Sequence, residues 1–365
     1  MGIKTKRLLC ILSSLDAGGA ETFLMKVYRS LPSDQYQLDF VVSQNNGCYT
    51  NEVLDRGGKI YEIPMRTKNF FGAFLGIRSI VKENHYNAVL KLGENSLAVM
   101  DLIAARLGGA KVLALRSCNA PTNISIKSRC IHVLFRPLLN VVSTIKLAPS
   151  QLAAEYMFGK RTRFVMLNNG VDKNVFKYDE IGRENIRNEF NLKDKLVVGH
   201  VGRFHDQKNH EFLLEVFGEI CRKNSNAILL LVGIGSKEAK IRQMVRDMNL
   251  VDRVIFAGQR FDIPQLLSAM DVFVFPSFHE GMPNTVIEAQ ATGLPCLIAD
   301  TITTEADITG LVKYFPLSYS PTAWAEETLH MSKLPRKDTA QDFITHGYDI
   351  HHVSNQLIEL LGMND

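Results

Sequence analysis

Residues 272–299 read VFVFPSFHEGMPNTVIEAQATGLPCLIA, and this stretch decides the fold that we expect. It begins with the apolar run Val272–Phe275 and ends with a second apolar run, Pro295–Ala299, both typical of buried strands. Between them, Pro283 suits the first position of a helix, and the apolar residues after it continue that helix. Strand and helix in alternation predict a mainly parallel, doubly wound sheet.

The same alternation extends toward the start of the chain. The runs that read as strands before residue 170 are Arg7–Leu15, Leu38–Val42, Lys59–Ile63, Ala88–Leu92, Lys111–Leu115 and Lys146–Ala148. Helix-compatible patterns lie between them at Ala20–Ser30, Phe70–Asn84 and Ser96–Arg106. A second set of strands is expected at Leu196–Val201, Ala227–Val232 and Val254–Ala257, ahead of the two runs quoted above.

The alternation of strands and helices is interrupted near Asn168–Asp172, where a polar, charged stretch begins. We therefore expect an α/β protein of two Rossmann-like domains, residues 1–170 and 171–345, with residues 346–365 forming a closing helix. Open parallel sheets bind ligands beyond the carboxyl ends of their strands, so two such edges facing one another would make a cleft.

The composition limits the classes of protein to which the chain can belong. A chain of 365 residues that is 46% hydrophobic and 22% charged is typical of a soluble protein with two domains. No window holds the roughly 20 apolar residues that a membrane-spanning helix needs. The basic, apolar start of the chain is interpreted as a buried first strand rather than a signal peptide, because no small-residue cleavage site follows it. The six cysteines show no C-x-x-C pair, so we expect reduced cytosolic thiols.

Charge is distributed unevenly along the chain. The whole chain has 42 Lys/Arg and 38 Asp/Glu, of which residues 1–170 contain 22 and 11, so the first part carries +11 and the rest −7. A basic first part could meet anionic lipid or a polyanion, or surface charge could simply drift between domains. Likewise, the basic and apolar stretch Ser125–Thr144 could rest on a membrane surface or pack on the sheet.

Two carboxylates, Glu280 and Glu288, accompany the predicted turn from strand to helix. Free amides and the positive end of the helix dipole would face a ligand there, and Gly281 lets the backbone approach it closely. Glu280 on the loop and Glu288 on the helix could grip two parts of one ligand. Alternatively, the segment is a plain strand, turn and helix with two surface carboxylates.

Two further glycine turns follow predicted strands. After Gly202, Arg203 can fork onto phosphate oxygens and Lys208 supplies a compact positive charge, as a bound diphosphate would require. Gly18 and Gly19 precede a helix as in a phosphate-binding turn, although the full G-x-G-x-x-G pattern is missing. The alternatives are an exposed basic loop for the first turn and a tight turn without a ligand for the second.

Together these motifs resemble those of the retaining GT-B glycosyltransferases with an E-x7-E signature, the group called family 4. The resemblance runs along nearly the whole chain. Its matching segments are, in order, Gly18–Glu21, Asn169–Asp172, Gly202–Asn209, Phe256–Gly258 and Glu280–Pro295. Asp300–Thr303 with Trp324 looks most like members that build capsular or extracellular polysaccharides.

The resemblance implies an enzyme that moves a hexose or N-acetylhexosamine from a nucleotide-diphosphate sugar, UDP by family frequency, to a saccharide acceptor that we expect to be lipid-linked. Arg203 and Lys208 would hold the donor diphosphate. Glu280 would contact the donor sugar, and Glu288 would hydrogen-bond the ribose. The other donor-site residues that the resemblance implies are Gly18, Gly19, Gly202, Arg260, Gly281, Met282, Pro283, Asn284 and Thr285.

The implied reaction is a front-face displacement, in which the acceptor hydroxyl attacks from the side that the diphosphate leaves. No metal and no cofactor are implied, because the two cations do the work that Mg²⁺ does elsewhere. No nucleic acid partner is implied. The chain is expected in the cytoplasm, either free or peripheral at the inner face of the cell membrane.

Two positions depart from the family pattern. Family members often carry histidine in the loop after the fifth strand, where this sequence has Cys118. Lys91 likewise stands where relatives commonly have histidine. The loop of Cys118 faces the transferred sugar in the family, so the donor sugar or the rate could differ.

Two other enzyme classes share part of these features. A nicotinamide dehydrogenase should show an intact G-x-G-x-x-G with an acidic residue about 20 positions further on, and neither follows the first predicted strand. A GT-B epimerase acting on a nucleotide sugar would share the fold and the donor. It would differ from a transferase because it consumes no acceptor.

Overall fold

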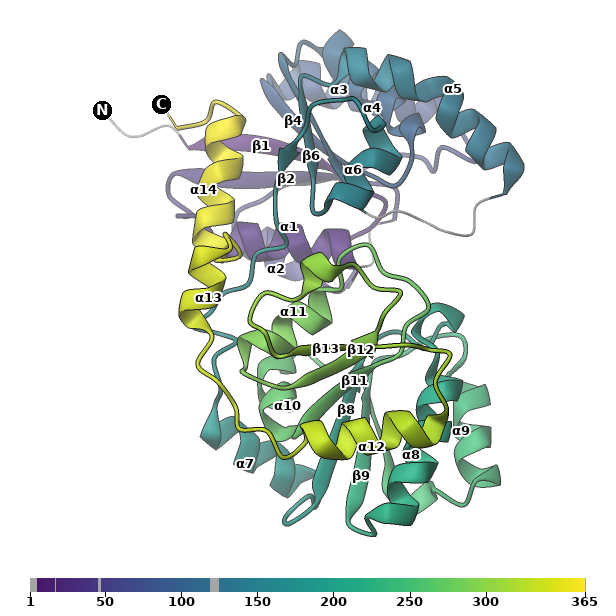
Figure 1. Cartoon of the computed structure of the whole chain (residues 1–365). Coiled ribbons are helices and arrows are strands. Elements are labelled where there is room, and N and C mark those ends of the chain that lie inside the picture. The colour runs from purple at the N-terminus through teal and green to yellow at the C-terminus, as the bar shows by residue number, and fades with distance from the viewer. Residues whose placement is uncertain (1–4, 17, 45–46, 119–124, 365) are drawn as a thin grey trace. The chain divides into compact units, whose positions relative to one another are not determined.

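The computed structural model describes residues 5–16, 18–44, 47–118 and 125–364 (Figure 1). Residues 17 and 119–124, in two of the loops discussed above, lie outside these ranges. The chain forms two compact units, one made of residues 1–170 with 347–365 and the other of residues 171–346. Among the helices described, none combines the length and the hydropathy needed to span a bilayer.

The first unit is built on a seven-stranded sheet in which every described pairing is parallel. In spatial order its strands are β3 (Ile60–Glu62), β2 (Tyr36–Val42), β1 (Lys6–Ile11), β4 (Ala88–Gly93), β5 (Val112–Ser117), β6 (Ile145–Ala148) and β7 (Val165–Met166). Its helices are α1 (Gly19–Ser30), α2 (Thr50–Asp55), α3 (Phe70–Asn84), η1 (Ser96–Ala98), α4 (Val99–Gly108), α5 (Ile126–Val142), α6 (Gln151–Phe158) and α14 (Ile350–Leu360).

Two hydrophobic cores lie on opposite faces of this sheet, because successive strand residues point to opposite sides. Leu8 and Cys10 of β1 belong to the core under α1 and α14. Leu9 and Ile11 belong to the core under α3, α4, α5 and α6. The C-terminal helix α14 therefore completes the first unit, and it packs beside α1 (Figure 1).

The second unit contains a six-stranded sheet, also parallel throughout its described pairings. In spatial order its strands are β10 (Val254–Gly258), β9 (Ala227–Val232), β8 (Leu196–Val201), β11 (Val272–Phe275), β12 (Cys296–Ala299) and β13 (Val312–Phe315). Its main helices are α7 (Glu180–Glu189), η2 (Asp206–Lys208), α8 (His210–Lys223), α9 (Glu238–Asp247), α10 (Ile263–Ala269), α11 (Asn284–Ala291), α12 (Pro321–Met331) and α13 (Ala340–Thr345).

Helices cover this second sheet in pairs. α8 and α12 pack side by side, and α7 packs against α10 (Figure 1). Trp324 of α12 is fully buried, donates its indole N–H to the Pro316 carbonyl at 2.9 Å and meets Phe212 of α8 edge to face. A buried indole with its N–H bonded fixes α12 without leaving a polar group unsatisfied.

The predicted fold class, two parallel-sheet Rossmann-like domains, is confirmed. Several details differ. β7 and β13 were not predicted, because both are short and only partly buried, so neither gives a continuous apolar run. Pro283 was expected to be the first helical residue but is the residue before it, in an extended conformation with ψ 100°, and α11 begins at Asn284.

The strand order of the second sheet indicates at which edge a ligand would bind. From β8 the chain proceeds outward to β9 and β10, then returns to place β11 on the other side of β8. The order therefore reverses between β8 and β11. In open α/β sheets, ligands bind beyond the carboxyl ends of the strands at such a reversal.

Candidate functional site

The carboxyl ends of β8 and β11 bring two of the predicted loops together. The strands pair in register through Val198 with Val272 and Gly199 with Phe273, so both end at the same edge of the sheet. The first loop then enters η2 and α8, and the second enters α11. Residues distant in the sequence thereby meet where the sheet order reverses.

Among the described residues, three hydrogen bonds to backbone carbonyls join the two loops. The backbone N–H of Phe278 donates to the Gln207 carbonyl at 2.9 Å, and the Gln207 side chain donates to the His279 carbonyl at 2.7 Å. The Asn209 amide donates to the Pro276 carbonyl at 3.2 Å. Because each bond crosses from one loop to the other, the loops hold a fixed geometry relative to each other.

Lys208 and Glu280 form an ion pair across this junction. The ammonium nitrogen of Lys208 donates to Oε1 of Glu280 at 2.7 Å, and it lies 4.6 Å from the centre of the Phe275 ring. The two side chains are 17% and 10% exposed, so the pair is largely removed from water yet still reachable by a ligand. An ion pair with this little exposure is more strongly coupled than one on an open surface.

Gly202 leaves room for the Lys208 side chain. A Cβ at residue 202 would lie 3.4 Å from the Cδ and Cε atoms of Lys208 and 3.1 Å from Nε2 of His200. Gly233, with φ +137°, approaches the same turn so closely that a Cβ there would lie 2.2 Å from the Gly202 carbonyl oxygen. Glycine is therefore required at 233 by both its conformation and its surroundings.

The start of α11 follows directly on Glu280. Among the predicted residues of this turn, Gly281, Met282 and Pro283 are buried, and Asn284 and Thr285 are half-buried. The Oδ1 atom of Asn284 is buried and has no hydrogen-bond partner among the described residues. Pro283 provides no side-chain cap, so the first turn of α11 presents backbone amides together with one unsatisfied acceptor.

Glu288 lies one turn further along α11 and is 6% exposed. A carboxylate at this depth is unusual on a helix unless a partner compensates it. The structure thus places Glu280 on the loop and Glu288 on the helix that follows it, as predicted. It contradicts the alternative in which both are surface carboxylates.

Two histidines beneath this junction were not singled out from the sequence. The Nδ1–H of His200 donates to the Val274 carbonyl at 2.9 Å, and the His200 ring lies 4.7 Å from the ring of His210. Burial, and to a lesser extent the nearby Lys208 charge, lower the pKa of His200 well below its ordinary value and that of His210 to about 4. Both rings are therefore neutral at physiological pH, so they add no positive charge under Lys208.

The two other predicted cations of this unit, Arg203 and Arg260, differ from Lys208 in their partners. Arg203 is exposed and forms no hydrogen bond or ion pair with the described residues, so its guanidinium is available to a ligand. Arg260 is instead held by Glu189 at 2.5 Å and Asp262 at 2.6 Å, and these carboxylates raise its pKa. The structure does not bring Arg260 into contact with the pair of Lys208 and Glu280.

The predicted residues of the first unit lie at the carboxyl edge of its own sheet. Gly18 is the residue before α1 and Gly19 is its first residue, at the turn that follows β1. Cys118 follows β5, and its backbone N–H donates to the Gly93 carbonyl of β4 at 3.1 Å. Burial raises the pKa of the Cys118 thiol to about 12, so it stays protonated.

Lys91 has a structural role that the sequence did not reveal. It lies in β4, is 4% exposed and pairs with Asp101 of α4 at 3.0 Å. Arg66 bonds to the same carboxylate oxygen at 2.5 Å. Lys91 therefore ties β4 to α4 rather than standing free at the edge of the sheet.

Across the part of the chain that the structure describes, no three His, Cys, Asp or Glu side chains gather in a way that could hold a metal ion.

Comparison with known proteins identifies relatives along the whole chain. A family model described as glycosyl transferases group 1 matches residues 182–349. EpsF of Bacillus subtilis (strain 168), classed by name as a glycosyltransferase, is 31% identical over 377 residues, which cover 100% of this chain and 98% of EpsF. The UDP-Gal:alpha-D-GlcNAc-diphosphoundecaprenol alpha-1,3-galactosyltransferase of Escherichia coli is 24% identical over 299 residues, 77% of this chain and 76% of that protein.

Solved structures share the fold. HepE of Anabaena, crystallised in complex with UDP and glucose, superimposes with a TM-score of 0.78 at 19% sequence identity. The match covers 98% of this chain and 99% of HepE. The predicted GT-B architecture is therefore confirmed over nearly the full length.

Proposed function

Because the chain belongs to the group 1 glycosyl transferases, we propose that it moves a hexose or N-acetylhexosamine from a nucleotide-diphosphate sugar to a saccharide acceptor, with retention of anomeric configuration. The observation that carries this proposal is the pair of Lys208 and Glu280 at the carboxyl edge of the second sheet. A cation, a carboxylate and a helix N-terminus side by side suit the two parts of an activated sugar, its diphosphate and its hydroxyl groups.

The diphosphate of the donor would bind between Lys208 and Arg203. Lys208 is already positioned by Glu280 and by the Phe275 ring, whereas Arg203 is exposed and unengaged by described residues. Backbone amides at the start of α11 would add partial positive charge, with Gly202 allowing close approach. We assign charge neutralisation of the leaving diphosphate to these groups, without a metal ion or cofactor.

Glu280 and Glu288 would bind the sugar and the ribose of the donor. Glu280 would accept hydrogen bonds from the sugar hydroxyls, and Glu288, buried on α11, would accept them from the ribose. The segment from Gly281 to Thr285 would line the sugar. Because the Arg260 guanidinium is engaged by two carboxylates, we assign contact with the base to the loop that carries it rather than to its charge.

The first unit would supply the acceptor side. Gly18 and Gly19, at the start of α1, would let the backbone of its first turn approach the donor phosphates closely, and Cys118 marks the loop expected beside the transferred sugar. The Cys118 thiol stays protonated, so we assign that loop a role through its backbone carbonyls rather than through a thiolate.

In the reaction, the bond between the sugar C1 and the diphosphate oxygen breaks as the bond between C1 and the acceptor oxygen forms on the same face. The leaving phosphate takes the proton of the acceptor hydroxyl, and the nucleoside diphosphate is released. Lys208 and Arg203 stabilise the negative charge that grows on the leaving oxygen. Preorganised charges of this kind are the largest single contribution in many enzymes.

Relatives support the choice of donor and acceptor. The Escherichia coli relative is named for a UDP-galactose donor and a diphosphoundecaprenol-linked acceptor, and HepE was crystallised with UDP. We therefore propose a UDP-sugar donor and a lipid-linked saccharide acceptor in surface polysaccharide synthesis, with the enzyme acting at the inner face of the cell membrane.

A transfer assay tests this function directly. The purified chain is incubated with UDP-glucose, UDP-galactose, UDP-N-acetylglucosamine or GDP-mannose and a panel of lipid-linked saccharides, and proton NMR reports the anomeric configuration of the product. We expect one donor to give an α-linked product from an α-linked donor. An inverted product would contradict the retaining mechanism, and interconversion of donor sugars without consumption of an acceptor would indicate an epimerase.

A further inference from the structure

The outward face of α5 in the first unit is apolar, although it is exposed. Ile126, Val133, Leu134 and Val141 are 83%, 50%, 73% and 78% exposed. Val133 and Leu134 are neighbours, and each lies seven or eight residues, about two helical turns, from Ile126 and from Val141, which places all four along one side of the helix. An aligned row of exposed aliphatic side chains differs from the scattered ones that any surface carries.

The opposite side of α5 is firmly packed, so its outward face is not exposed through loose attachment. His132 accepts from the Ser96 N–H at 3.0 Å through Nδ1 and donates through Nε2 to the Tyr156 carbonyl at 2.9 Å. Its ring also stacks on the Tyr156 ring with 4.4 Å between centroids. Leu139 and Val142 are buried in the core below. Packing on the sheet, one of the two expectations for Ser125–Thr144, is therefore confirmed for this side.

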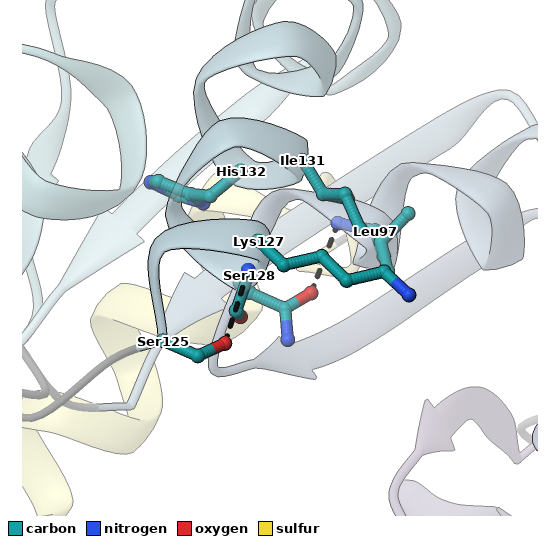
Figure 2. Close-up of a pocket in the computed structure, with 7 residues that line it drawn as sticks. Leu97, Ser125, Lys127, Ser128, Ile131 and His132 are labelled. Atoms are coloured by element: carbon teal, nitrogen blue, oxygen red, sulfur yellow. Dashed lines mark hydrogen bonds between the residues drawn. The ribbon is translucent and has the colours of Figure 1, made fainter.

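The apolar row continues onto η1. Figure 2 shows the side chains of Lys127 and Ile131 extending toward Leu97, which is 37% exposed, at the edge of a pocket of about 170 Å³. The outward face thus has apolar atoms from two elements and a lysine at its N-terminal end.

Positive charge surrounds this face. Between residues 125 and 163 the sequence has one acidic residue, Glu155, and the following basic residues: Lys127, Arg129, Arg136, Lys146, Lys160, Arg161 and Arg163. The loop with the last three lies alongside α5, because the Asn140 amide donates to the Phe158 carbonyl at 2.8 Å and to the Thr162 hydroxyl at 3.2 Å. Lys127, Arg129, Lys160, Arg161 and Arg163 are all exposed.

We propose that α5 and the loop Gly159–Arg163 bind the surface of a bilayer rich in anionic lipids, with the aliphatic row inserted at the level of the headgroups. Apolar side chains on one side of a helix and lysine or arginine beside them are the two features that hold helices at membrane surfaces. Each basic side chain near an anionic surface strengthens binding, and salt weakens that part of it. This inference deepens the proposed function and rests on it for its purpose, because a lipid-linked acceptor is reached only at a membrane.

Vesicle flotation tests the proposal. The full chain is mixed with vesicles of phosphatidylcholine alone or with phosphatidylglycerol, at low and high salt. We expect flotation with the anionic vesicles only, weakened by salt. Leu134→Ser/Val141→Ser and Lys160→Glu/Arg161→Glu should each lower the partition coefficient about tenfold.

Matched controls come from the second unit. Ile181 of α7 is 72% exposed, as Leu134 is 73% exposed, so Ile181→Ser removes an equal apolar side chain elsewhere. Lys333→Glu reverses an exposed charge in the same unit. Both should float like the unaltered chain, and circular dichroism confirms folding of each variant. Equal loss of flotation in these controls would overturn the assignment to α5.

Failure of this inference can be told apart from failure of the proposed function. Donor binding is measured by calorimetry without lipid in the same preparations. Donor binding without flotation would refute the membrane surface alone, and flotation without donor binding would refute the proposed function alone. The chain could also fail to float and instead form a dimer that Leu134→Ser/Val141→Ser dissociates. That result would show that a second copy covers this face, and it would overturn the proposal.

Discussion

The ammonium nitrogen of Lys208 lies 2.7 Å from Oε1 of Glu280, although 72 residues separate the two along the chain. Both side chains belong to loops that leave neighbouring strands, β8 and β11, at the carboxyl edge of the sheet. The pair lies where the sheet order reverses between these two strands, which is the place where we propose that the charged donor binds.

Replacing one member of this pair should lower both stability and activity. Lys208→Met leaves the Glu280 carboxylate without its counter-ion at a position where the side chain is 10% exposed. Loss of one partner from a largely buried pair destabilises by about 1–3 kcal/mol. If Lys208 also neutralises the leaving diphosphate, transfer falls about 100-fold or more. Urea unfolding and initial rates measure the two effects.

The double variant Lys208→Met/Glu280→Gln separates a structural from a functional role. It removes both charges, so the free energy of unfolding should return to within about 1 kcal/mol of the original value. Transfer should stay as low as in the single variant. A double variant that recovered both stability and activity would show that the pair only holds the loops together.

Glu288→Gln should weaken donor binding more than it slows the chemical step. The change removes a negative acceptor and keeps the size of a buried side chain. We expect the KM for the donor to rise about tenfold or more with kcat changed less, as for a group that binds donor and transition state alike. Glu326→Gln, on the exposed surface of the same unit, is the control. An unchanged donor KM would exclude the ribose role.

Gly202→Ala should reduce activity through Lys208. The added methyl would lie 3.1 Å from Nε2 of His200, so that ring must shift slightly, and it would contact two carbons of Lys208 at 3.4 Å and so restrict the lysine side chain. We expect about a tenfold lower rate, because small displacements of a catalytic charge are expensive in rate. Gly218→Ala is the matched control, since its methyl would meet only the flexible end of Met248. Full activity in Gly202→Ala would show that His200 and Lys208 accommodate the added methyl without loss of function.

Stability should fall in acid because of the buried histidines. The pKa of His210 is lowered from 6.5 to about 4 in the folded chain, so below pH 6.5 the unfolded chain takes up a proton that the folded one does not. The stabilisation is complete above pH 6.5 and is lost as the pH falls toward 4, by about 3 kcal/mol for this residue. Melting temperatures between pH 7.5 and 4.5 measure the effect.

His210→Phe tests this account, because phenylalanine preserves the ring contact with Phe204 but cannot titrate. The melting temperature of this variant should depend less steeply on pH than that of the original chain. His330→Gln, at a surface position, should leave the slope unchanged. The same slope in His210→Phe and the original chain would mean that His210 does not titrate in this range.

The sequence predicted five of the six strands of the second sheet, because each of the five is visible in a local run of residues. β9 and β11 are continuous apolar runs and β8 is mostly apolar. Gly202 and Lys208 lie within 7 residues of the end of β8, and Glu280 and Glu288 lie within 13 residues of the end of β11. Parallel pairing then brings the loops together without further information. The boundary at Pro283 was wrong by one residue because proline is accommodated both at the first helical position and just before it.

Features that depend on distant packing could not be predicted. Lys91 was noted only because it stands where relatives commonly have histidine, and only the structure shows its bond to Asp101 of α4. His200 and His210 lie in patterns that fit an ordinary strand and helix, so their contact with each other depends on how α8 packs. For Ser125–Thr144 the sequence left two alternatives open, packing on the sheet and resting on a membrane surface, since a core face and a membrane face have the same periodicity.

Isothermal titration calorimetry of UDP and UDP-sugars into the unaltered chain and into Lys208→Met tests the central claim most directly. We predict that the unaltered chain binds one UDP-sugar and UDP without added metal, and that Lys208→Met weakens both by about tenfold or more while its circular dichroism spectrum is preserved. Equal affinity for UDP in the two proteins would contradict the assignment of the donor diphosphate to Lys208 and, with it, the site proposed at the edge of the second sheet.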